Sequence, residues 1–210
     1  NTSNGVEVTF SENVTSIPAA MLLDIANIKK ITFTSEDVTY VNLGAFSGLS
    51  NLQEVVIPST DAWFKMSFAS AGANPLQNGA DLIVNGSAVT EISMPNDLTT
   101  IGNYQFEGMA SLTSFTFNPA LTSVGEGAFR GCINLTKIDV GNVENWAKLT
   151  SFSETKQNAP FNSSQGDLYE NGKIVKELVI PNSVETIGSC TFMNMKIETL
   201  RFGTGLTSIS

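Results

Sequence analysis

The sequence contains no histidine, and this absence removes several kinds of active site at once. A Ser-His-Asp triad or a Cys-His pair needs an imidazole, and so do most zinc sites. No glycine-rich phosphate loop is present either, because the glycines of residues 125–131, GEGAFRG, fall at the turns of a repeat. We therefore predict no enzymatic activity, no catalytic residue, no metal site and no cofactor.

Cysteine is almost as scarce, with 2 residues in a chain of 210. Cys132 and Cys190 occupy different positions of the repeat, and three expected strands separate them. A disulfide needs Cα atoms within about 7 Å of each other, so these two cysteines are not predicted to pair. Cys132 is more typical of a small buried apolar side chain.

Positive charge is also in short supply, since 11 Lys and Arg face 20 Asp and Glu, for a net charge of −9. The acids are scattered and the basic residues nowhere cluster, which disfavours nucleic acid and anionic membranes as partners. No run of 18 apolar residues is present, so no membrane insertion by this segment is expected. The first ten residues do not resemble a signal peptide, and we expect a mature or trimmed start.

What the sequence does contain is one spacing of apolar residues, used five times. Apolar residues follow a starting residue by five, eleven, fourteen and sixteen positions, and the copy that begins at Ile187 has lost one residue in its second half. A fixed set of offsets predicts a structural repeat. The four complete copies are Ile17, Leu22, Ile28, Ile31 and Phe33; Val41, Phe46, Leu52, Val55 and Ile57; Ile101, Phe106, Leu112, Phe115 and Phe117; and Val124, Phe129, Leu135, Ile138 and Val140.

Each copy predicts one short strand and one tight turn. Its second half, L-x-x-I-x-V, alternates apolar and polar residues like a strand with one buried face. Its first half turns near Gly125 in residues 121–140 and is long enough only for a 3₁₀ or α turn. Seven places after each start stands a residue that tolerates positive φ, which predicts an αL cap. These residues are Asp24, Gly48, Gly108, Gly131 and Asn194.

A unit of about 23 residues cannot bury its apolar side chains alone, so the copies are expected to stack into a solenoid. The starts at 17, 41, 101, 124, 187 and 209 lie 24, 60, 23, 63 and 22 residues apart. The two long steps contain matching segments, 81–102 and 167–188, and each has Asn-Gly between two strands, which predicts a hairpin with a type I′ turn. We interpret each long element as one coil enlarged by a loop and a hairpin.

The stacking predicts a single sheet and a single aromatic spine. Phe46, Phe106, Phe129 and Phe192 are equivalent in their copies and should pack one above the other in the core. Strands are expected around Ile31, Val55, Ile92, Phe115, Ile138, Leu178 and Leu200.

Residues 121–140, LTSVGEGAFRGCINLTKIDV, resemble the leucine-rich repeats of BspA-like, or Treponema pallidum type, surface proteins of gut bacteria. The resemblance rests on Ala128, Phe129, Gly131, Cys132 and Leu135 in this copy and extends from about residue 14 to the end. It implies an α/β leucine-rich-repeat solenoid that is β-rich and right-handed, with short parallel strands, 3₁₀ or short helical turns and two inserted hairpins. Residues 1–210 are expected to form a single domain.

Both ends of the array depart from the pattern. Pro18 and Leu22 replace the family's Gly and Phe in the first coil, which we expect to act as a cap. At the other end LTSIS, residues 206–210, begins a copy and stops before its Phe and strand. We expect the chain to be a fragment of a longer one, with Phe202 half covered and this end prone to end-to-end self-association.

The resemblance implies a non-enzymatic protein-interaction or adhesion module, on the cell surface or secreted, whose signal or lipid anchor has been removed. Its partner is expected to be a host protein or a protein of a neighbouring cell. Solenoids bind along the continuous surface that the stack displays. The outward strand positions form the candidate face: Thr32, Val56, Ser93, Thr116, Asp139, Val179 and Arg201.

Two alternatives stay open beside this interpretation. Trp63 and Trp146 precede the two hairpins and are candidate glycan contacts, although their duplicated context favours packing of the inserted loop onto the solenoid. Glu91 and Glu177 occupy equivalent strand positions and are the candidate carboxylates of a glycosidase, which needs two such groups. A solvated strand face is the favoured interpretation of the two glutamates.

Overall fold

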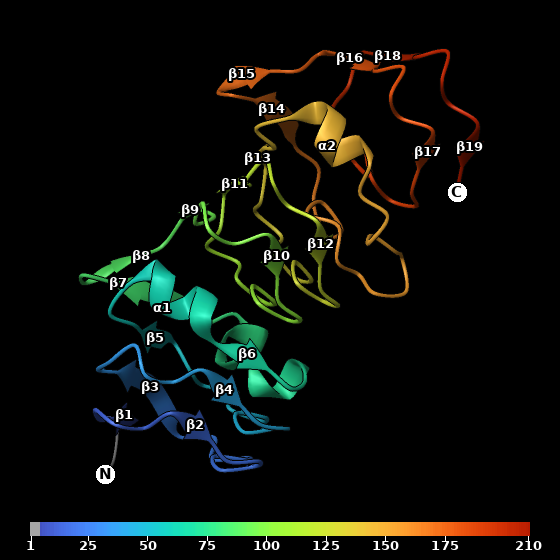
Figure 1. Ribbon diagram of the computed structural model, residues 1–210. Helices are drawn as coiled ribbons and strands as arrows, with labels where there is room; N and C mark the ends of the chain where they lie inside the picture. The colour runs from blue at the N-terminus through green and yellow to red at the C-terminus, as the bar shows by residue number, and fades with distance from the viewer. Residues whose placement is uncertain (1–4) are drawn as a thin grey trace.

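The computed structural model describes residues 5–210, which form a β-solenoid of about 9 turns. Most coils carry a longer strand on one side of the molecule and a two-residue strand on the other (Figure 1). The first described residues and the C-terminus lie at opposite ends of the solenoid (Figure 1). The solenoid predicted from the spacing is confirmed, and so is the leucine-rich-repeat architecture that the resemblance implies.

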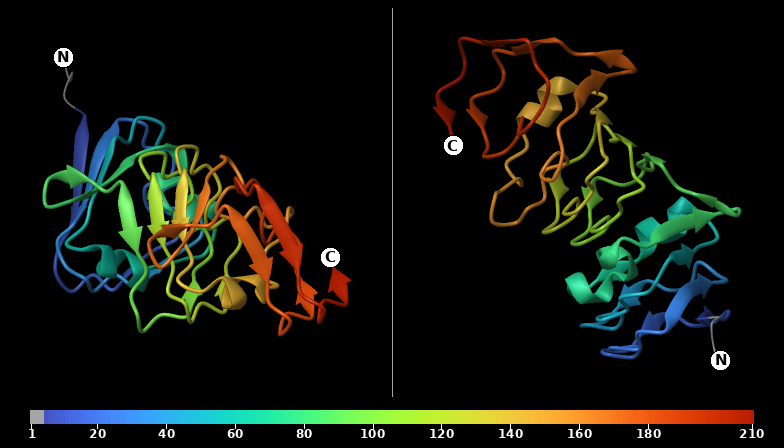
Figure 2. Two further views of the ribbon diagram at one scale, coloured as in Figure 1. Left: turned by 90° about the horizontal axis from the view of Figure 1, so that it is seen from above. Right: turned by 180° about the vertical axis from the view of Figure 1, so that it is seen from behind.

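The longer strands form three separate sheets, so the solenoid consists of three stacks. The orange and red strands of the third stack are inclined to the yellow strands of the second (Figure 2). Stack I contains β1 (Val6–Phe10), β3 (Ile28–Phe33), β5 (Glu54–Val56), β7 (Asp81–Val84) and β8 (Ser87–Ala88). Stack II contains β9 (Glu91–Ser93), β11 (Ser114–Thr116), β13 (Lys137–Asp139), β14 (Asp167–Glu170) and β15 (Lys173–Ile174). Stack III contains β16 (Glu177–Ile180) and β18 (Thr199–Phe202).

The short strands on the other side of the coils divide in the same way. They form the groups β2 (Ser16–Ile17), β4 (Tyr40–Val41) and β6 (Ser67–Phe68); β10 (Thr100–Ile101) and β12 (Ser123–Val124); and β17 (Thr186–Ile187) and β19 (Ser208–Ile209). Helix α1 (Thr60–Lys65) and the 3₁₀ turns η1 (Ala71–Ala73) and η2 (Pro75–Asn78) lie between β5 and β7, and helix α2 (Val143–Ala147) lies between β13 and β14.

The two predicted hairpins mark the boundaries between stacks. β8 folds back antiparallel on β7, and β15 folds back antiparallel on β14. The turn residues have positive φ, 51° and 76° at Asn85 and Gly86 and 49° and 77° at Asn171 and Gly172, so both type I′ turns are confirmed. After each hairpin the chain begins a new stack instead of extending the old sheet.

The prediction of one enlarged coil in each long element is wrong. β7 pairs in parallel with β5, and β14 pairs in parallel with β13, so the first arm of each hairpin is itself a strand of the main sheet. Each long element therefore completes one coil before its hairpin and starts the next coil after it. Strand β1 was not predicted either, and it covers β3 beyond the coil that was expected to be the cap.

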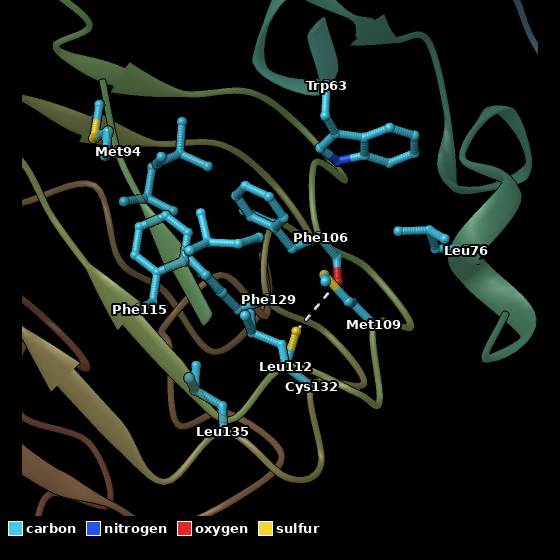
Figure 3. Packing of buried hydrophobic residues seen from close by; sticks show 14 of the residues in the cluster. Trp63, Leu76, Met94, Phe106, Met109, Leu112, Phe115, Phe129, Cys132 and Leu135 are labelled. Atoms are coloured by element: carbon cyan, nitrogen blue, oxygen red, sulfur yellow. Dashed lines mark hydrogen bonds between the residues drawn. The ribbon is translucent and has the colours of Figure 1, made fainter. Parts of the chain in front are cut away.

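The single phenylalanine spine is also wrong, for the same reason. Phe106 stacks on Phe129 with ring centroids 5.6 Å apart (Figure 3). Phe46 instead packs against Phe10 and Phe33 in stack I. Several residues of the two additional coils are buried in the core, among them Leu76 and Phe161, whereas Phe192 is only half-buried.

The backbone of each coil turns at two left-handed positions, of which the sequence predicted one. The five αL caps predicted seven places after each start all have positive φ, from 56° at Asn194 to 79° at Gly131. A second series, three places after each start, has φ between 53° and 63° and comprises Ala20, Gly44, Tyr104, Gly127 and Cys190. The turn predicted near Gly125 is therefore centred two residues later.

Candidate binding surface

The candidate face forms three short rows of side chains. Strand register places Thr32 beside Val56 in stack I, Ser93 beside Thr116 in stack II, and Val179 beside Arg201 in stack III. Each hairpin separates one row from the next, because the chain starts a new sheet there. The structure thus brings the predicted residues together in pairs within each stack and not across all seven positions.

Asp139, the seventh predicted residue, does not face solvent, and its inclusion in the candidate face was wrong. Its side chain is buried, and Oδ1 accepts hydrogen bonds from the backbone N–H groups of Gly141 and Asn171, both at 3.0 Å. Oδ2 accepts a third bond from the N–H of Gly172. Asp139 therefore holds the turn of the second hairpin, and its side chain is not accessible to a partner protein.

Two residues that the sequence analysis missed complete the face of stack II. Tyr169 on β14 lies beside Asp139 in the register, and Lys137 places its Nζ 4.8 Å from the centroid of the Tyr169 ring. Ser93 and Thr116 are exposed on the same sheet. The gap-free match of residues 81–102 to 167–188 could have identified Tyr169 as a strand residue, because it aligns with Ile83 on β7.

The two tryptophans are core residues, so their assignment as glycan contacts was wrong. Their exposed fractions are 1% for Trp63 and 3% for Trp146, which leaves no ring face for a sugar. Trp63 Nε1 donates to the carbonyl oxygen of Gln105 at 2.8 Å, and Gln105 Nε2 donates back to the carbonyl oxygen of Trp63 at 2.6 Å. Because Trp63 lies in stack I and Gln105 in stack II, this pair of bonds crosses the first boundary.

The second boundary repeats this arrangement. Trp146 Nε1 donates to the carbonyl oxygen of Thr191 at 2.9 Å, and the Thr191 hydroxyl lies within hydrogen-bond distance of two carbonyl oxygens, that of Gly188 at 2.8 Å and that of Leu149 at 3.3 Å. Gln105 and Thr191 both lie four places after the start of their copies. Each tryptophan thus ties the helix before a hairpin to the first turn after it, as the packing interpretation requires.

The two glutamates proposed for a glycosidase do not form a pair. Glu91 lies on β9 and Glu177 on β16, in different sheets, with β11, β13 and β14 stacked beyond Glu91. Those strands alone span about 14 Å at about 4.8 Å each, more than the roughly 9.5 Å upper limit for paired glycosidase carboxylates. Arg201 Nε lies 2.9 Å from Glu177 Oε1, so this carboxylate belongs to a surface ion pair.

The other reactive side chains of the described residues form neither a metal site nor a cysteine pair. Within residues 5–210 no group of three or more His, Cys, Asp or Glu side chains is arranged to hold a metal ion. Cys132 is fully buried, and its Sγ donates to the carbonyl oxygen of Phe106 at 3.2 Å (Figure 3). Burial raises the pKa of the Cys132 thiol to about 12. Cys190 is half-buried, and both cysteines are free, as predicted.

One buried carboxylate lies on the turn side of stack II. Glu107 Oε1 accepts a hydrogen bond from Arg130 Nε at 2.7 Å, while Oε2 has no partner within residues 5–210. Burial raises the pKa of Glu107 and outweighs the opposite effect of the Arg130 guanidinium. This ion pair links two neighbouring coils.

Comparison with known proteins identifies the repeat. A sequence profile described as BspA type leucine rich repeat region matches 6 copies, over residues 1–71, 83–166 and 162–210. A search of the curated proteins found no match. No helix within residues 5–210 is both long enough and apolar enough to cross a membrane.

Several solved bacterial structures are similar to this chain. A leucine-rich repeat protein from Eubacterium ventriosum ATCC 27560 is 22% identical, with a TM-score of 0.48 over 97% of this chain and 49% of that one. A leucine rich cell surface protein from Faecalibacterium prausnitzii A2-165 is 18% identical, with a TM-score of 0.45 over 93% of this chain and 59% of that one. The pneumococcal vaccine antigen PcpA is 16% identical, with a TM-score of 0.47 over 98% of this chain and 59% of that one. The chain thus spans between 49% and 59% of the length of these three proteins.

Proposed function

The chain belongs to the BspA type leucine-rich repeat family, and from this premise we propose that it is a non-enzymatic module that binds another protein through the sheet of stack II. Leucine-rich repeats generally mediate protein interactions. The step from family to partner is an analogy, so the site itself has to support it.

The observation that supports the proposal is the composition of the stack II face. Four parallel strands present exposed hydroxyl groups at Ser93 and Thr116, a carboxylate at Glu91, and the paired Lys137 and Tyr169 side chains. Tyrosine supplies a large contact area at a low cost in conformational entropy, and small hydroxyl side chains adapt their hydrogen bonds to a partner. Such a mixed face suits a protein surface better than a single small ligand.

We place the partner on a host cell or a neighbouring cell, and the module itself on the cell surface or in the secreted fraction. The test is binding of the fluorescently labelled chain to such cells before and after two treatments. Trypsin removes surface proteins, and periodate destroys surface glycans. The proposal predicts that trypsin abolishes binding and periodate does not. Binding that is lost only after periodate, or that survives both treatments, would contradict it.

A further inference from the structure

A groove at the first boundary between stacks is the feature that the proposed function does not use. It lies between α1 and the segment 95–98 that follows β9, and its volume is about 190 Å³. Figure 1 shows this segment passing from β9 toward β10 beside α1. The half-buried side chains of Phe64, Pro95 and Leu98 form its apolar floor. Drug-sized ligands occupy about 300–1,000 Å³, so this groove fits one side chain.

The rim of the groove carries more negative than positive charge. It is lined by Glu36, Asp61, Asp97 and Lys65. Lys65 Nζ lies 2.5 Å from Glu36 Oε2, and this pair neutralises one carboxylate. Asp61 and Asp97 are exposed and take no side-chain hydrogen bond or ion pair from any residue between 5 and 210. Two exposed carboxylates thus stand above an apolar floor, and of these Asp61 is attracted by the Lys65 charge on the same helix.

Both walls of the groove are held by hydrogen bonds that involve residues outside its lining. The bonds between Trp63 and Gln105 hold α1 against stack II. On the opposite wall, Asn118 Nδ2 donates to the carbonyl oxygens of Pro95, Asn96 and Leu98 at 3.3, 2.8 and 2.8 Å. A site held in this way loses little entropy when a ligand enters.

We propose that this groove docks a single basic side chain, arginine in preference to lysine, presented by a loop of a protein partner. The aliphatic stem lies on Phe64, Pro95 and Leu98, and the cationic head lies at Asp61 and Asp97. A planar guanidinium stacks on an aromatic ring and bonds carboxylates with several N–H groups, which an ammonium does not do equally well. The net charge of −9 favours the approach of a basic partner. This inference rests on the proposed function, because it requires a protein partner.

The second boundary offers a groove of similar position that serves as an internal control. That groove, of about 320 Å³ beside α2, is also lined by three carboxylates. Each of them already has a partner within the chain, so the groove has no free carboxylate for a cation. The pairs are Glu144 with Lys148 and Ser183, Glu170 with the N–H of Val143, and Glu177 with Arg201.

The test is a titration of the ¹⁵N-labelled chain with N-acetyl-arginine N-methylamide, followed by backbone amide shifts. We expect saturable shifts at Asp61, Phe64 and Asp97 and none at the second groove. N-acetyl-norleucine N-methylamide, which has the stem without the charge, should bind at least about tenfold more weakly. Shifts that do not saturate, or that are equal for the two probes, would overturn the proposal.

Variants test whether the arginine shifts depend on the two carboxylates of the groove. The double variant D61N/D97N should lose the arginine shifts with an unchanged melting temperature, and Glu144→Gln in the second groove should leave them intact. If the double variant does not fold, Asp97→Lys alone must abolish the shifts. Retained shifts in the folded D61N/D97N chain, or in Asp97→Lys, would overturn the proposal.

The failure of this inference can be told from the failure of the proposed function. Cell binding that trypsin abolishes, together with no arginine shifts, would refute the groove as a site for a basic side chain and leave the protein-binding role intact. Arginine shifts that depend on Asp61 and Asp97, without any cell binding, would remove the surface-binding role and support the groove as a site for a basic side chain.

Discussion

At the scale of single residues, the tryptophans show how a residue type can suggest the wrong role. An exposed indole is a common sugar platform, but both indoles here are buried with their N–H groups bonded to a carbonyl. Their duplicated context was the correct signal. It could not show the bond partners, because Gln105 and Thr191 lie 42 and 45 residues further along the chain.

Replacing Trp63 by Phe tests the boundary bond. The variant keeps an aromatic ring and removes the N–H donor, so the buried carbonyl of Gln105 loses its partner. We expect a loss of about 1–3 kcal/mol in the free energy of unfolding, measured by denaturant titration. Trp146→Phe should behave alike because its bond is equivalent, whereas a loss below measurement error in both would show that these bonds do not stabilise the boundaries.

A second prediction at this scale concerns the two cysteine thiols. The thiolate is the reactive form of cysteine, and a pKa of about 12 leaves Cys132 almost entirely protonated at pH 8. Burial also raises the pKa of Cys190, but that residue is half-buried. A thiol reagent at pH 8 should therefore label Cys190 slowly, and Cys132 only after unfolding. Rapid labelling of Cys132 in the native chain would show that this core position opens.

At the scale of elements, periodicity predicted each regular coil because its signal lies within about 20 residues. The Asn-Gly turns were predicted for the same reason. Periodicity did not reveal that β7 and β14 are strands of the main sheet, because parallel pairing with β5 and β13 is not encoded in local spacing. Asp139 was misplaced for a related reason, since the turn that covers it lies 32 residues later.

Asp139→Ala tests the role of this carboxylate at the second hairpin. The N–H groups of Asn171 and Gly172 would lose their acceptor, so their amide hydrogens should exchange at least about tenfold faster, as expected for the loss of a hydrogen bond to a charged group. Hydrogen exchange followed by NMR measures this rate.

The first hairpin provides the control for Asp139→Ala. Val56 occupies the position equivalent to Asp139, and its side chain has no hydrogen-bond acceptor. Because Val56→Ala removes no hydrogen bond, the amide hydrogens of Asn85 and Gly86 should exchange at an unchanged rate. If exchange at Asn171 and Gly172 does not change in Asp139→Ala, the carboxylate does not hold the turn.

At the scale of the whole molecule, the sequence predicted a single continuous sheet and the chain forms three. The reason is geometric, because an antiparallel arm covers the edge on which the next coil of the same sheet would pair. The family and the solenoid were predictable from one 20-residue copy, since every copy carries the same core. The positions of the stacks and the shape of the binding face could not be predicted from one copy, because they depend on contacts between different copies.

The 210-residue chain should associate with itself in solution. β18 pairs with β16 on one edge, and its other edge has no strand partner within residues 5–210. Phe202 on this strand is 48% exposed, and Ile209 on β19 is 62% exposed. An unpaired edge with exposed apolar side chains favours association. Sedimentation should show concentration dependence, reduced in Phe202→Lys, while a strictly monomeric species at high micromolar concentration would contradict this prediction.

The central claim is that the chain binds a protein through the sheet of stack II, and one pair of variants tests it most directly. Thr116 and Thr100 are both exposed strand residues, the first on β11 of stack II and the second on the short strand β10 on the other side of the coils. Thr116→Arg should reduce trypsin-sensitive cell binding at least about tenfold, because a bulky charge in a packed interface costs more than 1.4 kcal/mol. Thr100→Arg should bind like the unmodified chain. Full binding by a folded Thr116→Arg, or equal loss in both variants, would contradict the claim.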